Sequence, residues 1–277
     1  MSTPIFTGAG VALITPMNSD GSVNFDELGR LLEFQIENGT DAIIACGTTG
    51  EAATLSVEEH KAVLSYVAEK VNKRIPVIAG TGSNDTATAI SLSKSAQKYG
   101  ADGLLSVTPY YNKTSQAGLV KHFTTIADSV DLPIILYNVP SRTGCNMQPK
   151  TYAELEKHQN IVGVKEANGD ISSVSLTRSL CSDDFAIYSG NDDQTVPFMS
   201  LGGKGVISVF SNFCPKEMHE ICQACLDNDF QRAAEMNFHF VELMDIMFSD
   251  VNPIPVKTAM NLIGFNAGEC RLPLVPM

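Results

Sequence analysis

The sequence predicts an α/β protein in which eight strands and the helices between them form one (β/α)8 barrel, a TIM barrel, with an appended C-terminal helical layer. Three observations favour this fold. Short apolar, β-branched runs recur along the chain, amphipathic segments separate them, and the runs are apolar throughout instead of alternating with polar residues. Strands that alternate with helices pair in parallel, and parallel strands buried on both faces have this continuous apolar pattern.

Eight apolar runs are the candidate strands. Their regular spacing and unreversed order favour a closed barrel, and an open doubly wound sheet is the alternative, because sequence does not show closure. The runs extend over Val11 to Thr15, Ala42 to Cys46, Pro76 to Ala79, Gly103 to Val107, Pro133 to Tyr137, Ile161 to Val164, Ala186 to Tyr188 and Gly205 to Val209.

The segments between the runs carry signals for helix ends. Ser56 and Glu59 have the spacing of a capping box, in which each side chain satisfies a free backbone amide of the first turn. Glycine often ends a helix because it adopts the left-handed conformation without strain. The other predicted ends are Asn24 or Asp26 and Asn84 or Asp85 as starts, and Gly39 and Gly100 as stops.

After the eighth run the chain continues as helices. They are predicted over Lys216 to Leu226, Phe230 to Phe248 and Pro255 to Ile263. A length of 277 residues suits one domain of this type, since such barrels run to about 250 residues. We therefore expect a single domain over residues 1–277, with the barrel at about 1–214 and the C-terminal helices at about 215–277.

Composition excludes several classes of partner. The chain has 31 acidic and 19 basic residues, a formal charge of −12, and its basic residues are scattered, which argues against nucleic acid and anionic membranes. No apolar run approaches the roughly 20 residues of a membrane span.

Seven dispersed cysteines without a signal segment indicate a reduced, cytoplasmic protein. Cys222 and Cys225 have a Cys-x-x-Cys spacing, but they lie in a predicted helix without a second pair, so we expect helix packing and neither a metal nor a cofactor.

Lys165 is the most informative candidate for chemistry. In a (β/α)8 barrel the catalytic residues gather at the carboxyl ends of the strands, and Lys165 directly follows the sixth run. Desolvation at the rim of an apolar barrel disfavours the ammonium form, which leaves an amine able to attack a ketone. The alternative is a lysine that extends from a strand end into solvent.

Other strand ends carry groups that suit the same chemistry. Tyr137 closes the fifth run, beside Lys165 in a barrel, where a phenol can carry protons; alternatively it is a rim tyrosine. Thr48 and Thr49 lie in a glycine-flanked turn whose donors suit a small carboxylate, although any tight turn can have this composition. Arg142 follows the fifth run and can grip a second carboxylate, or form a surface ion pair. Together these groups predict imine chemistry on a keto acid.

Seven ordered motifs resemble the dihydrodipicolinate synthase family, within the N-acetylneuraminate lyase superfamily. The resemblance spans almost the whole chain. The motifs are Gly47 to Glu51, Thr108 to Asn112, Tyr137 to Gly144, Gly163 to Ala167, Ser189 to Gly190, Gly205 to Ser208 and Asn252 to Lys257. Within the superfamily, the Ser141 to Gly144 segment and the Tyr110-Tyr111 pair resemble the synthases more than the sugar-acid aldolases.

The resemblance implies a reaction and a role for each site residue. Lys165 would form an imine with pyruvate, and the derived enamine would attack L-aspartate 4-semialdehyde, in lysine and diaminopimelate biosynthesis. A homotetramer, built as a dimer of dimers, is implied as well. The implied roles are Tyr137 as general acid/base, Thr49 as proton relay to Tyr111 of a neighbouring subunit, Thr48, Thr49 and the backbone at Gly190 and Ile207 as pyruvate positioners, and Arg142 as the ligand of the semialdehyde carboxylate.

The resemblance also implies a possible effector site for L-lysine at Ala53, His60, Asn84 and Tyr110. Val57 and Thr88 stand where lysine-sensitive members tend to have a basic residue and a glutamate. Without that carboxylate we expect weak or absent inhibition by lysine. The family usually continues into a final helix after the Arg271 to Leu274 segment, whereas this sequence stops at Met277.

Two alternative functions differ from this reading. A sister aldolase would use the same lysine imine to form or cleave a 2-keto sugar acid, and it would release pyruvate from that substrate. A non-catalytic barrel used as a sensor or scaffold would have no need of Lys165, Tyr137, Thr49 and Arg142 together.

Overall fold

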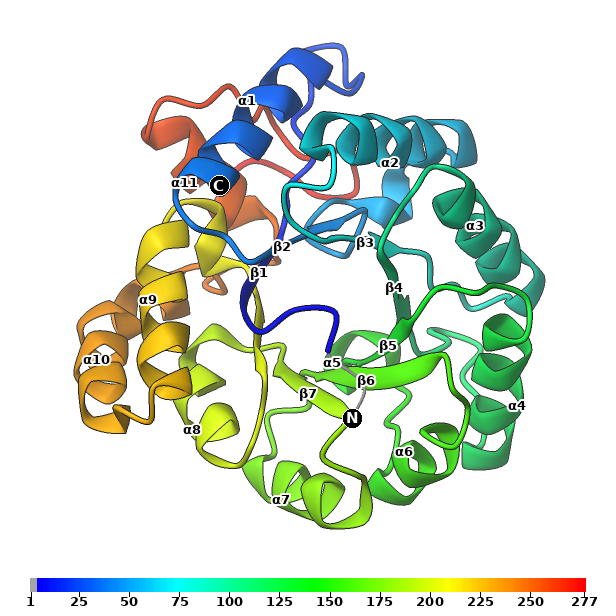
Figure 1. The fold of residues 1–277 in the computed structure, drawn as a ribbon. Coiled ribbons are helices and arrows are strands. Elements are labelled where there is room, and N and C mark those ends of the chain that lie inside the picture. The colour runs from blue at the N-terminus through cyan, green and yellow to red at the C-terminus, as the bar shows by residue number, and fades with distance from the viewer. Residues whose placement is uncertain (1–3) are drawn as a thin grey trace.

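The computed structural model describes residues 4–277, and its centre is a closed barrel of eight parallel strands. The strands are adjacent in chain order and β8 pairs with β1, so the predicted closed barrel is confirmed and the open sheet is excluded (Figure 1). The strands are β1 (Gly8–Ala12), β2 (Ala42–Ala45), β3 (Val77–Gly80), β4 (Gly103–Val107), β5 (Ile134–Asn138), β6 (Ile161–Glu166), β7 (Ala186–Ser189) and β8 (Gly205–Ser208).

The largest shift from the predicted strands is in β1, which begins three residues before the predicted Val11. Gly8 and Gly10 have low strand propensity, yet the barrel needs glycine here, since a Cβ at either position would collide with Asp41 or Ile44. The predicted strand extended too far toward Thr15 because Leu13 and Ile14 are apolar. Both are buried although the strand ends at Ala12.

A ring of helices surrounds the barrel (Figure 1). The capping box of Ser56 and Glu59 is confirmed, Asn24 and Asp85 are the caps that start their helices, and Gly39 and Gly100 are left-handed. The helices are α1 (Phe25–Glu37), α2 (Val57–Val71), α3 (Thr86–Lys98), α4 (Gln116–Ala127), α5 (Pro140–Thr143), α6 (Pro149–Leu155), α7 (Ile171–Leu180) and α8 (Thr195–Ser200), with short 3-10 turns η1 (Ala52–Thr54), η2 (Asp192–Gln194) and η3 (Phe210–Asn212).

Three further helices follow β8 within a residue or two of the predicted bounds. They are α9 (Pro215–Leu226), α10 (Phe230–Ile246) and α11 (Ile254–Leu262). Cys222 and Cys225 lie in α9, buried in an apolar cluster with residues of β8 and α10, as expected for helix packing. The segment after α11 returns to α1, where Phe265 contacts Phe34.

Apolar side chains fill the amino-terminal part of the barrel. Phe6 stacks on Tyr188 with ring centroids 4.5 Å apart, and the Tyr188 hydroxyl donates to the Phe6 carbonyl oxygen at 2.7 Å. Ile44, Ile78 and Ile207 belong to the same buried cluster. This packing leaves the carboxyl end of the barrel for a site.

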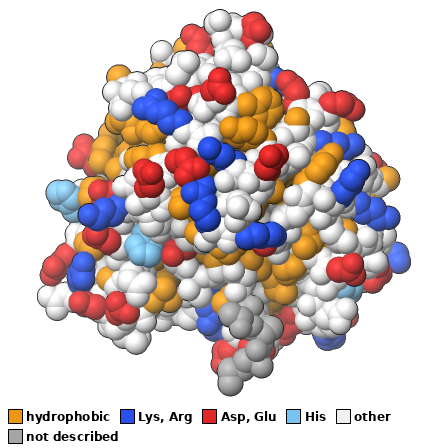
Figure 2. All heavy atoms as spheres, turned by 45° about the horizontal axis from the view of Figure 1, so that its top comes forward, with side chains coloured by type: hydrophobic (Ala, Val, Ile, Leu, Met, Phe, Trp, Pro, Cys, Tyr) orange, Lys and Arg blue, Asp and Glu red, His pale blue; other side chains and the backbone are white. Residues whose placement is uncertain are grey.

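Charges of both signs are interspersed on the molecular face that Figure 2 shows, where no single-sign basic stripe gathers. In residues 4–277 no helix is both long and apolar enough to cross a membrane.

Candidate active site

Lys165 lies inside the barrel near its carboxyl end. It belongs to β6, one residue beyond the predicted strand end, and its side chain is buried, with 5 % exposed. Its register partner on β5 is Tyr137, and Lys165 Nζ lies 4.5 Å from the centroid of the Tyr137 ring. An ammonium over a phenol face is attracted by the ring quadrupole. The predicted neighbourhood of amine and phenol is therefore present.

Asp192 is a buried carboxyl that the sequence reasoning missed. Its Oδ2 accepts hydrogen bonds from the backbone N–H groups of Val209 and Phe210, at 3.1 and 3.0 Å. Burial raises the pKa of the Asp192 carboxyl above its ordinary value, while hydrogen bonds from Ser208 and the backbone and the charge of Lys165 oppose that shift. Asp192 therefore ties the loop after β7 to the loop after β8, beside the amine.

The turn after β2 presents the two threonines. Thr48 lines a cavity, and Thr49 is buried, with its Oγ1 accepting a hydrogen bond from Asn252 Nδ2 at 3.0 Å. A buried ion pair anchors the turn, since Lys257 Nζ lies 2.8 Å from Glu51 Oε1 and both side chains are 2 % exposed. Glu51, Asn252 and Lys257 lie inside two of the motifs that resemble the family. Their roles depend on contacts between distant parts of the chain, which the sequence alone does not show.

Arg142 lies on the short helix α5, which follows β5 directly. Its guanidinium is exposed at the cavity and donates to the Asn252 carbonyl oxygen at 3.2 Å. Asn252 thus contacts both Thr49 and Arg142, two residues that come from different strand ends. The segment before α11 therefore holds together two of the predicted substrate contacts.

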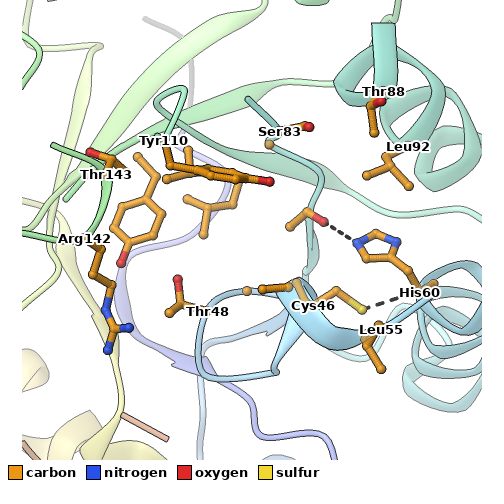
Figure 3. A pocket seen from close by; sticks show the side chains of 18 of the residues that line it. Cys46, Thr48, Leu55, His60, Ser83, Thr88, Leu92, Tyr110, Arg142 and Thr143 are labelled. Atoms are coloured by element: carbon orange, nitrogen blue, oxygen red, sulfur yellow. Dashed lines mark hydrogen bonds between the residues drawn. The ribbon is translucent and has the colours of Figure 1, made fainter. Parts of the chain in front are cut away.

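A cavity of about 400 Å³ is lined by three predicted site residues, Thr48, Tyr137 and Arg142, and by predicted effector residues, whereas Lys165, Thr49, Gly190 and Ile207 lie outside its lining. In Figure 3, Arg142 and Tyr110 lie at one side, Thr48 near the middle, and His60 with Thr88 at the other side. The lining residues of the effector side are Ala53, Leu55, Val57, His60, Ser83, Thr88 and Leu92.

The predicted effector residues differ in their placement. Ala53, His60 and Tyr110 line the cavity, whereas Asn84 lies outside its lining and its carbonyl oxygen accepts from Asn112 Nδ2. His60 is buried, with Nε2 at 2.8 Å from the Gly80 carbonyl oxygen. Burial lowers the pKa of His60, so its ring is neutral at pH 7.

Tyr111 is not part of the cavity lining of its own chain. Its side chain is 91 % exposed and its backbone is left-handed, with φ of 69°. A left-handed backbone is uncommon for a bulky residue and is typical of functional positions. The structure therefore directs this ring away from the chain that carries it.

Gly190 and Ile207 lie at the ends of β7 and β8. A Cβ on Gly190 would come within 2.6 Å of the Ala167 Cβ, so only glycine fits. The Gly190 N–H donates to the Glu166 carbonyl oxygen at 2.8 Å, so this N–H is already engaged within the barrel. Ile207 is fully buried in the barrel.

Glu166 is a second buried carboxyl that was not singled out. It accepts hydrogen bonds from Asn138, Tyr152 and Asn168, and burial raises its pKa to about 7 although each of these bonds favours the ionised form. The only feature of the sequence that pointed to Glu166 is its position directly after Lys165.

For a metal ion, the residues that the structure describes offer no group of three or more His, Cys, Asp or Glu side chains.

Comparison with known proteins gives the family. The model of the dihydrodipicolinate synthetase family matches residues 5–277. A 4-hydroxy-tetrahydrodipicolinate synthase of Acetivibrio thermocellus is 56 % identical over 277 residues, which cover 100 % of this chain and 94 % of that protein. Among solved structures, a dihydrodipicolinate synthase is 51 % identical with a TM-score of 0.96, covering 98 % of this chain and 94 % of the other.

A further solved structure differs in assembly. It is a monomeric dihydrodipicolinate synthase variant, 45 % identical with a TM-score of 0.96, covering 99 % of this chain and 92 % of that one. Matches of this extent and identity cover the barrel, the C-terminal helices and every strand end described above. The chain therefore belongs to the dihydrodipicolinate synthetase family.

Proposed function

We propose that Lys165 captures pyruvate as an imine and that the enamine derived from it condenses with L-aspartate 4-semialdehyde. The activity is that of a 4-hydroxy-tetrahydrodipicolinate synthase, in lysine and diaminopimelate biosynthesis. The observation that carries the proposal is the buried Lys165 amine against the Tyr137 ring at the carboxyl end of the barrel. A nearly dry amine beside a phenol suits the attack on a ketone.

The reaction proceeds in three stages. The Lys165 amine attacks the ketone carbon of pyruvate, and the adduct loses water to give the iminium. Loss of a methyl proton gives the enamine, whose carbon attacks the aldehyde of the semialdehyde. The amino group of this adduct then attacks the imine carbon and releases the Lys165 amine, which closes the ring and restores the enzyme.

Tyr137, Thr49 and Tyr111 carry the protons in this proposal. The Thr49 oxygen already accepts from Asn252, so its own hydroxyl proton is free to be donated, which supports a relay. Tyr137 lies beside the amine whose water and proton transfers it serves. The exposed, left-handed Tyr111 supports its delivery to the site of a neighbouring subunit.

Substrate carboxylates would meet hydroxyl and guanidinium donors in this proposal. Thr48, Thr49 and the backbone at Gly190 and Ile207 would position pyruvate, and the exposed guanidinium of Arg142 would hold the semialdehyde carboxylate. Arginine matches a carboxylate with two parallel donors. The contact of Asn252 with both Thr49 and Arg142 supports a fixed spacing between the two substrates.

Regulation by lysine is weak or absent in this proposal. No carboxylate side chain belongs to the lining of the cavity that reaches Val57, His60 and Thr88. A cationic effector bound there would lose its water without gaining a counter-charge, which is unfavourable.

Assembly and location complete the proposal. We infer that the chain self-associates, because in this proposal Tyr111 acts in the site of a neighbour, and the family resemblance extends this to a homotetramer, a dimer of dimers. The monomeric relative means that family membership alone does not decide the number of subunits. The free thiols of all seven cysteines support a cytoplasmic, reducing compartment.

Borohydride trapping tests the mechanism. The wild type is treated with pyruvate and borohydride and measured by intact-mass spectrometry, together with Lys165→Ala and a control, Lys121→Ala, whose side chain lies exposed on α4. We expect a pyruvate adduct on the wild type and the control that maps to Lys165 and is missing from Lys165→Ala. Folded wild-type protein without an adduct would contradict the proposal.

A further inference from the structure

Glu166 collects hydrogen bonds from three different segments. Asn138 Nδ2 donates to both of its oxygens, at 2.9 and 3.2 Å, the Tyr152 hydroxyl donates to Oε2 at 2.7 Å, and the Asn168 N–H donates to Oε1 at 3.0 Å. The side chain is buried, with 3 % exposed. One carboxylate therefore joins the end of β5, helix α6 and the loop after β6.

Glu166 and Asn138 lie directly behind the reactive pair. On neighbouring strands Tyr137 is opposite Lys165, and Asn138 is opposite Glu166. Successive side chains of a strand point to opposite faces, so the first pair faces the barrel interior and the second pair faces the helices. The hydrogen bonds between Asn138 and Glu166 thus clamp the two strands at the position that sets the distance from the phenol to the amine.

Asn138 extends the clamp toward Arg142. Its Oδ1 accepts from the Met147 N–H at 3.0 Å, and its Nδ2 also donates to Asn146 Oδ1 at 2.9 Å. Residues 146–147 follow the short helix that carries Arg142. The same network therefore contacts β6, which carries Lys165, β5, which carries Tyr137, and the segment that follows Arg142.

Packing alone does not call for a carboxyl here. Burying a carboxylate without a cationic partner is unfavourable, and an apolar side chain would fill the space between strand and helix at lower cost. No cation contacts the Glu166 oxygens in the part of the chain that the structure describes; their partners are two amides and a phenol. A carboxyl group at such a place is better explained by geometry that the reaction needs.

We propose that Glu166 is a positioning residue, which through Asn138 holds the Lys165 amine and the Tyr137 phenol at the distance that imine formation requires. The proposal rests on the function proposed above. Glu166 does not touch substrate in this role. It acts on the rate of the imine step and leaves the groups that contact pyruvate unchanged.

A polarity swap tests the proposal. Glu166→Gln keeps the shape but places an NH2 group against the donors of Asn138, and Asn138→Asp places two carboxyl groups together. The double variant restores one donor and one acceptor, now in the opposite direction. The measurements are the rate of borohydride-trappable imine formation with pyruvate alone, kcat and the KM for pyruvate, with melting temperature as the check on folding.

We expect each single variant to lose about 10- to 100-fold in imine rate and kcat, because small misplacements of reacting groups have such effects, with KM for pyruvate within about threefold. We expect the double variant to recover about tenfold over either single variant. Asp41→Asn is the matched control, since its carboxylate bridges the Ala9 N–H and His219 at the amino end of the barrel. Its imine rate should equal that of the wild type.

Three outcomes would overturn the proposal. They are a folded Glu166→Gln with wild-type imine rate, a double variant no faster than the slower single variant, or a control that loses as much rate as Glu166→Gln. A wild type that forms no adduct at Lys165 would instead contradict the proposed function itself, so the two failures are distinguishable.

Discussion

Tyr137 has two separable parts in the proposed site, a ring that contacts Lys165 Nζ at 4.5 Å and a hydroxyl that moves protons. Tyr137→Phe keeps the ring and removes only the hydroxyl. We expect kcat to fall by about 10²- to 10⁴-fold, the usual contribution of general acid–base catalysis, while the melting temperature stays close to wild type. Steady-state kinetics with both substrates measures this effect. A variant with more than a third of the wild-type kcat would remove Tyr137 from the proton path.

The buried pair of Glu51 and Lys257 makes a prediction on stability. Lys257→Met leaves the Glu51 carboxylate buried without its counter-charge, so we expect a loss of about 3–5 kcal/mol in the free energy of unfolding. Glu51→Gln combined with Lys257→Met removes both charges and should lose much less. Urea denaturation measures both variants, and equal losses in the two would show that charge pairing is not the cause.

Thr88 gives a residue-scale test of lysine regulation. The wild type should keep most of its turnover in submillimolar L-lysine, because the cavity lining has no carboxylate. Thr88→Glu adds one and should increase inhibition by lysine, with Thr88→Gln as the uncharged control. Strong suppression of the wild type by submillimolar lysine would contradict this prediction.

At the scale of elements, the segment after α11 is held by one side chain. Arg271 forms an ion pair with Glu59 at the start of α2 and donates to the Thr54 and Gly21 carbonyl oxygens, at 2.7 and 2.9 Å. The Arg271 guanidinium, with help from the Ser56 N–H, lowers the pKa of Glu59 to about 2. The segment is thereby attached to the turn and helix that follow β2.

This attachment predicts a pH dependence. A lowered pKa means that the stabilisation is present above the ordinary value of 4.5 and is lost as pH falls through about 2. Because the pair is partly exposed, its free energy is only about 1 kcal/mol after screening. Arg271→Ala should therefore be less stable than wild type at pH 7, with the Glu59 part of the difference gone near pH 2. Denaturation at both pH values measures it, and an unchanged difference would contradict the role of Glu59.

Elements were easier to predict than contacts. Local signals located all eight strands and the three C-terminal helices, because apolar runs, caps and left-handed glycines depend on near neighbours along the chain. They missed that β6 includes Lys165 and Glu166, since charged residues usually mark a strand end. Asn252 was beyond reach for another reason: its contacts with Thr49 and Arg142 join distant parts of the sequence, and only the closed barrel brings them together.

At the scale of the whole molecule, the role proposed for Tyr111 would make one chain alone an incomplete enzyme. Its side chain is 91 % exposed and does not line the cavity of its own chain. In the proposed assembly, each site takes its Tyr111 from a neighbour by an exchange that the two subunits make symmetrically. The catalytic groups of one site would then belong to two chains.

Hybrid enzymes test this exchange. Lys165→Ala and Tyr111→Phe are each expected to be nearly inactive, but a dimer with one chain of each has one site in which an intact Lys165 meets the partner's intact Tyr111. Co-expression with two different tags and purification through both should give hybrids with up to about half of the wild-type activity, because symmetric exchange leaves one of the two sites of each mixed dimer whole. Hybrids as inactive as the parents would mean that Tyr111 serves its own chain. A Tyr111→Phe parent with full activity would remove Tyr111 from the proton relay and leave Tyr137 and Thr49 as its remaining members.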